Sequence, residues 1–181
     1  SHNAMNDLAG GKKYLDKATA LKEHLTPRDQ LYLDAWTAQV NDPSAILQKW
    51  QEMVSLYPDY FPAIANVGNS FFSSNRYAEG IPFAKRAISP QSEFAPLSWD
   101  LLGRLSLGQD KFADAQVAFD KAVAMGVSSA VVRRANTLAA QRRFDEAAKA
   151  WPQALKVSCV YFDRVSVQLD QGRWSAAASE A

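Results

Sequence analysis

The sequence of 181 residues predicts an all-α protein in which helical hairpins stack into a right-handed superhelix. Apolar residues recur at helical spacing along nearly the whole chain, and no segment shows the alternation of a strand. A pattern of two helices joined by a tight turn returns about every 34 residues. Hairpins that repeat in this way form one elongated array in which each unit contacts only its neighbours.

The clearest unit covers residues 98–126. The polar segment 108–111 separates its two helices, and Gly108 is expected at the C′ position that ends the first helix. Gly103 and Ala115 are small enough to let the two helices approach closely. The apolar positions at helical spacing are Trp99, Leu102, Leu105 and Leu107, followed by Ala115, Phe119, Ala122 and Val123.

This unit resembles the tetratricopeptide repeat. The family's consensus places are filled by Trp99, Leu102, Gly103, Ala115, Phe119 and Ala122. Two places depart from the consensus, because Ser106 replaces an aromatic residue of the first helix and Val127 replaces the closing proline. The resemblance implies a superhelix whose first helices line a concave face, and a function in binding other proteins.

Related patterns occur on both sides of this unit. Gly68 lies 35 residues before Gly103, and Ala147 lies 32 residues after Ala115. We expect one array over residues 5–181, preceded by an expression-tag remnant at residues 1–4. The expected repeats are 5–25 (partial), 27–59, 60–94, 95–127, 128–158 and 159–181 (partial).

The N-terminal third contains the strongest helix-start signal. A first helix is expected over residues 7–24. Thr26 can cap the next helix, Pro27 suits its first position, and Asp29 stands where a capping-box acid belongs. Further helices are expected at 46–56, 60–73, 77–89, 94–107, 111–125, 128–141, 144–157, 159–171 and 174–181.

The C-terminal segment predicts that the chain is a fragment of a longer bacterial protein. A helix that begins at Trp174 has only two turns before the sequence ends. Solenoids normally finish in a polar capping helix. The apolar residues at the two truncated ends could also pair with another copy of the chain, so self-association through these ends is an alternative.

Composition and motifs argue against catalysis and against two classes of partner. A net charge of +1 gives the chain no strong positive electrostatic potential that would attract nucleic acid. No apolar run reaches the ~20 residues that membrane insertion requires. His24 has no neighbouring metal ligand, Cys159 suits helix packing, and the segment 10–13 lacks the spacing of a phosphate loop. We expect no enzyme activity and no cofactor. The sequence does not determine the cellular compartment, although it slightly favours the cytoplasm over the periplasm.

The first helices of the repeats supply the candidate binding residues. Carried over from the family, the groove positions form a polar row with apolar neighbours, and the predicted peptide-binding residues are Asn66, Asn69, Phe72, Asp100, Leu101, Arg104, Arg133 and Asn136. Asparagine amides can hold a peptide backbone, and arginine can bind a carboxylate with two parallel bonds. The competing interpretation is a solvated face on which Arg104 pairs with Asp100 along one helix.

The groove resembles the carboxylate clamp of chaperone-binding repeats only in part. Asn69 and Arg133 match that clamp, but Ala65, Leu101 and Ser129 stand at its other three places. A chaperone C-terminus is therefore not the expected ligand.

The predicted function is a non-catalytic protein–protein interaction scaffold. Its concave groove would bind a peptide segment or a partner helix of unknown identity. The alternative is a structural spacer, or an oligomerisation or sensor arm, within a larger regulator or enzyme such as one linked to a kinase or a transcription regulator.

Overall fold

The computed structural model describes residues 8–154, and this part of the chain is all α-helical, as predicted. Short 3-10 turns at Lys22–His24 and Pro43–Ala45 lie on either side of α2. The α-helices are α1 (Leu8–Ala20), α2 (Pro27–Asn41), α3 (Ile46–Leu56), α4 (Phe61–Ser73), α5 (Tyr77–Ala87), α6 (Ala95–Leu107), α7 (Phe112–Ala124), α8 (Ser128–Ala140) and α9 (Phe144–Ala154).

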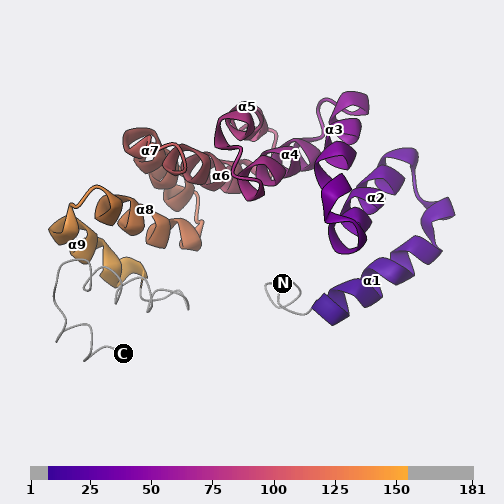
Figure 1. The fold of residues 1–181 in the computed structure, drawn as a ribbon, viewed down its shortest axis with the longest axis horizontal. Helices are drawn as coiled ribbons and strands as arrows, with labels where there is room; N and C mark the ends of the chain where they lie inside the picture. Colours follow the sequence, from indigo (N-terminus) through magenta and orange to yellow (C-terminus); the bar gives the residue numbers. More distant parts are fainter. Residues whose placement is uncertain (1–7, 155–181) are drawn as a thin grey trace.

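The helices form an arch (Figure 1). Each helix packs mainly against the one before and the one after it, which is the arrangement of a solenoid. On the inner side α6 also contacts α4 and α8, the first helices of the neighbouring hairpins. The second helices α3, α5 and α7 lie along the outer side, where the curvature holds them further apart.

An aromatic cluster fills the core between α2, α3 and α4. Trp50 is almost fully buried, and the rings of Tyr32 and Trp36 meet it edge-on with centroids 5.5 and 5.8 Å away. Tyr60 stands against Tyr32 in the same way at 5.8 Å. Edge-to-face contacts suit the ring quadrupoles, so these four rings join the first two hairpins with defined geometry.

Small residues set the spacing inside the next hairpin. A Cβ on Gly103 would lie 2.5 Å from the ring of Phe119, which is fully buried. The ring of Phe119 therefore occupies the space that any larger residue at position 103 would need. This contact brings α6 and α7 together and confirms the predicted role of Gly103.

The turns within the hairpins share one backbone conformation and one hydrogen-bond pattern. Asn75, Asp110 and Arg142 adopt left-handed conformations with φ of 56°, 56° and 58°. After each of them the next amide donates to a carbonyl five residues back, for example Lys111 to Ser106 at 3.0 Å. This is the Schellman arrangement, which satisfies carbonyls at the end of a helix.

The expectation that Gly108 takes the C′ position is wrong. Its φ is −63°, and Asp110 holds the left-handed conformation instead. Glycine is needed at position 108 for space, because a Cβ there would lie 2.6 Å from the ring of Tyr77.

The start of α2 follows the predicted capping pattern. The backbone N–H of Asp29 donates to the Thr26 hydroxyl at 3.2 Å, and that hydroxyl donates to the Asp29 carboxylate at 2.8 Å. The hydrogen bond from Thr26 is the main reason why the pKa of Asp29 is lowered. Pro27 follows at the first helical position, where no N–H is required.

Several expectations concern residues outside 8–154. These are the tag remnant, Cys159, the helices at 159–171 and 174–181, and the end of the helix at 144–157. Within the described part, no helix is long and apolar enough to cross a membrane. The same residues include no group of three side chains that could hold a metal ion.

Candidate functional site

The inner face carries a continuous set of polar contacts across α4, α6 and α8. Asn69 of α4 meets Arg104 of α6, which is its counterpart one repeat later. Asp100 of α6 meets Arg133 of α8, one place beyond its own counterpart Val132. We call the set formed by Asn69, Asp100, Arg104, Ser129 and Arg133 the inner-face cluster.

Asp100 lies at the centre of the inner-face cluster. Its side chain is only 7% exposed, and its two oxygens face two arginines. Oδ1 accepts a hydrogen bond from Nη1 of Arg133 at 2.8 Å. Oδ2 lies 3.2 Å from Nε of Arg104, an ion pair without the alignment of a hydrogen bond. Two guanidinium groups therefore share one carboxylate, and the cluster keeps one net positive charge.

Arg104 is the more deeply buried of the two cations. Its side chain is 24% exposed, its guanidinium lies over the ring of Phe72 at 4.6 Å, and its Nη2 donates to Oδ1 of Asn69 at 3.1 Å. Burial lowers the pKa of Arg104, and the nearby charge of Asp100 opposes that shift. An arginine in this setting stays protonated, so it acts as a fixed charge that links α6 to α4.

Arg133 is the accessible cation of the inner-face cluster. Its side chain is 34% exposed, and Nη1 donates to both Asp100 and the hydroxyl of Ser129, each at 2.8 Å. Its Nε and Nη2 have no hydrogen-bond partner among residues 8–154. These N–H groups remain available to an acceptor that arrives along the inner face.

The structure joins five of the eight predicted binding residues through direct contacts: Asn69, Phe72, Asp100, Arg104 and Arg133. The amide of Asn69 is used internally on both sides, since its nitrogen also donates to the Ala65 carbonyl at 3.2 Å. Asn66 and Asn136 lie outside this network. Both are half-buried, and within the described chain neither side chain makes a hydrogen bond to another group.

Two of the predicted residues are not available to a ligand. Leu101 is 1% exposed and packs into the core against Leu105 and Ala84, with Cδ2 3.0 Å from where a Cβ on Gly68 would lie. The expectation that Leu101 grips a ligand from the groove is wrong. Its side chain turns inward and occupies the space that a side chain at Gly68 would need. Asp100 is buried as well, and its contacts are to the two arginines.

Ser129 is the member of the cluster that the candidate set omitted. It lies one helical turn before Arg133 on α8 and accepts from its Nη1. The four-residue spacing of a hydroxyl and an arginine could have suggested this contact. The sharing of Asp100 between two helices had no such signal, because it depends on how α6 and α8 pack.

No protein-family model matches the chain, and no curated protein is significantly similar to it. Solved structures do resemble it. MamA from Desulfovibrio magneticus RS-1 is similar with a TM-score of 0.68 and 14% identity, over 86% of this chain and 91% of that one. A second MamA structure gives a TM-score of 0.67 and 13% identity over 84% and 87%. These likenesses support a tetratricopeptide-like helical-repeat fold, and identities this low carry no conclusion on function.

Proposed function

We propose that this chain is a non-catalytic interaction scaffold that binds an acidic peptide segment or a partner helix along its inner face. The observation that carries the proposal is the inner-face cluster. It holds one net positive charge and presents the unpaired Nε and Nη2 groups of Arg133 on a half-exposed side chain. A carboxylate of a partner would match both the charge and the paired donor geometry of this guanidinium.

The residues around Arg133 divide into those that build the site and those that could bind a partner. Asp100 and Arg104 are held by internal contacts and fix the position of the site. Asn66 lies three residues before Asn69 on α4, and Asn136 lies three residues after Arg133 on α8, and both side-chain amides are free of hydrogen bonds within the described chain. Such amides can pair with the N–H and C=O groups of an extended backbone. The proposed contact set is therefore Asn66, Arg133 and Asn136.

The test starts with the isolation of proteins that the chain captures from a lysate of the source cells. The bound segment is then made as a peptide. Calorimetry measures its affinity for the unmodified chain, for one triple variant and for one double variant. The inner variant carries Asn66→Ala, Arg133→Ala and Asn136→Ala. The outer control carries Lys121→Ala and Lys149→Ala, which change exposed residues of α7 and α9.

We expect the inner variant to lose at least about tenfold in affinity, since a charge-assisted bond and two amide contacts are removed. The outer control should bind within twofold of the unmodified chain. Circular dichroism and thermal melting establish that both variants remain folded. Equal affinity of the two variants would place binding elsewhere, and the failure of any partner to bind saturably would favour the spacer alternative.

A further inference from the structure

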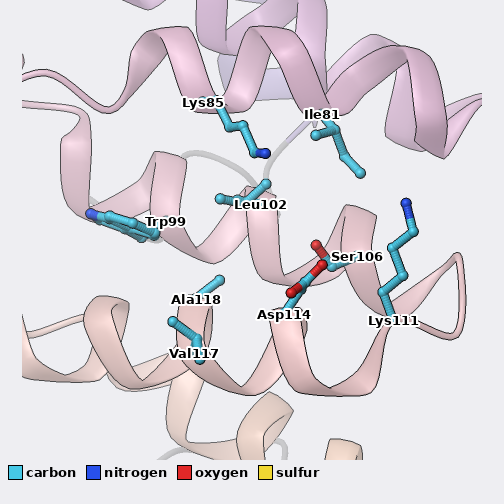
Figure 2. Close-up of a pocket in the computed structure, with 9 residues that line it drawn as sticks. All are labelled: Ile81, Lys85, Trp99, Leu102, Ser106, Lys111, Asp114, Val117 and Ala118. Carbon is cyan, nitrogen blue, oxygen red and sulfur yellow. The ribbon is translucent and has the colours of Figure 1, made fainter.

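A pocket of about 250 Å³ opens on the outer side of the arch, between α5 and α7 (Figure 2). We call it the outer pocket. The outer side of α6 forms its floor, because the curvature holds α5 and α7 apart there. Apolar side chains make up most of its lining, with two lysines and an aspartate around them: Ile81, Lys85, Trp99, Leu102, Ser106, Lys111, Asp114, Val117 and Ala118.

The preceding gap, between α3 and α5, explains why this one is open. When Gly68 is aligned with Gly103, Phe71 falls at the place of Ser106, and Phe83 at the place of Ala118. The rings of Phe71 and Phe83 pack together with centroids 5.6 Å apart and fill their gap. Two small residues in place of two aromatic rings therefore create the outer pocket.

The charged residues of the outer pocket also differ from their counterparts. Arg76 and Arg143, which stand at the place of Lys111, pair with Glu79 at 2.5 Å and with Glu146 at 2.6 Å. By contrast, Lys85, Lys111 and Asp114 form no ion pair with any residue of the described chain.

The following gap, between α7 and α9, is charged differently again. Arg134 stands at the place of Leu102 and Asp120 at the place of Lys85, and these two residues pair with each other at 3.3 Å. Among the gaps within residues 8–154, the one between α5 and α7 thus combines an open apolar floor with unpaired charges. Its two lysines and one aspartate leave a net charge of +1.

We infer that the outer pocket binds one large apolar side chain of a partner protein segment that carries acidic residues beside it. The volume is below the roughly 300–1,000 Å³ of pockets for free small molecules, so a single leucine- or phenylalanine-sized side chain suits it better. Trp99, Leu102 and Val117 provide the apolar contacts. Figure 2 shows the ammonium group of Lys85 directed over the pocket, where it can meet a flanking carboxylate.

A synthetic peptide tests this inference without knowledge of the natural partner. The probe has a central phenylalanine with two glutamates on each side, and binding is followed by NMR through the indole N–H signal of Trp99. Trp99→Phe identifies that signal among the five tryptophans. Two comparison peptides replace the phenylalanine by alanine, or all four glutamates by lysine.

We expect the acidic phenylalanine peptide to shift the Trp99 signal saturably. Each comparison peptide should bind at least tenfold more weakly, because one lacks the side chain that fills the pocket and the other has the wrong charge. Equal binding of the lysine peptide, or no saturable shift at millimolar peptide, would overturn the inference. A shift that grows with protein concentration in the absence of peptide would also overturn it, because the occupant would then be a second copy of the chain.

Two variants locate the binding. Ala118→Phe places a ring where Phe83 stands in the preceding gap, so the array already accommodates such a residue. Lys85→Glu with Lys111→Glu reverses the charge at exposed positions and leaves the packing intact. Both should reduce binding at least tenfold, and Lys121→Glu, on α7 outside the pocket, should leave it unchanged. If Lys85→Glu with Lys111→Glu binds the acidic peptide as well as the unmodified chain, the inference fails.

Discussion

Arg133 of α8 donates a hydrogen bond to Asp100 of α6 at 2.8 Å, although the two residues are 33 positions apart in the sequence. The other oxygen of Asp100 lies 3.2 Å from Arg104 of the same helix. One buried carboxylate therefore fixes the position of two cations on the inner face. The charge that we propose for partner binding depends on a contact between hairpins, and so on the stacking of the array.

The first prediction concerns the removal of this carboxylate. Asp100→Asn keeps the shape of the side chain but leaves Arg104 and Arg133 close together without a counter-charge. Removal of one partner from a fully buried pair typically costs 3–5 kcal/mol, and the partial exposure of Arg133 reduces the expected loss to about 2 kcal/mol. The free energy of unfolding in urea measures the effect.

Asp120→Asn is the matched control for this experiment, because Asp120 pairs with Arg134 at the surface with a side chain that is 52% exposed. An exposed pair of this kind should contribute at most about 1 kcal/mol. If Asp100→Asn and Asp120→Asn lose the same free energy of unfolding, the burial of Asp100 does not increase the contribution of its ion pairs to stability.

The second prediction concerns the turn between α8 and α9. Arg142 has a φ of 58°, which strains an ordinary side chain but not glycine. We expect Arg142→Gly to raise the free energy of unfolding by about 0.5–1 kcal/mol. Asp110→Gly, at a φ of 56°, should gain less, because aspartate tolerates this conformation better. A loss of stability in Arg142→Gly would contradict the explanation.

The sequence was sufficient to predict the helices and their pairing, because each hairpin is a local structure. The Thr26 cap, the close approach at Gly103 and the order of helices depend on residues near one another in the chain. The local pattern predicts Gly108 at the left-handed position that Asp110 occupies, since glycine usually takes that conformation. In the folded chain Gly108 is needed for contact with Tyr77, which lies on another hairpin and is not visible in the local pattern.

The candidate sites could be predicted only in part for the same reason. The pairing of Arg104 with Asp100 follows from a four-residue spacing on one helix, whereas the bond from Arg133 depends on the offset between α6 and α8. The inward turn of Leu101 depends on Gly68 of the preceding hairpin. A local signal for the outer pocket did exist, because Ser106 departs from the aromatic residue expected there. Ser106 alone does not predict a pocket, because the cavity also requires the small side chain of Ala118 on α7.

The third prediction uses the pKa of Asp29. A folded-state pKa below the unfolded value means that the ionised carboxylate stabilises the fold above the unfolded pKa, near 4, and that this contribution is lost as the pH falls through the folded pKa. Thr26→Ala removes the main cause of that shift. The melting temperature of this variant should fall below that of the unmodified chain at pH 6, and the difference should shrink below about pH 4.

NMR titration of the Asp29 carboxyl carbon provides a direct measurement of the same effect. In Thr26→Ala its pKa should rise toward the ordinary value. A difference in melting temperature that stays constant from pH 6 to pH 2.5 would indicate that the hydroxyl acts only through the backbone N–H.

The last prediction concerns the contact between Gly103 and Phe119. A methyl group at position 103 would need the space of a ring only 2.5 Å away, so Gly103→Ala should destabilise the chain by about 1–3 kcal/mol through overpacking. Phe119→Leu shortens the obstructing side chain. The double variant should then be less destabilised than the sum of the two single ones by at least about 1 kcal/mol, because the two residues compete for one space. Urea unfolding of all four proteins completes this cycle, and strict additivity would mean that α6 and α7 can move apart to admit the methyl group.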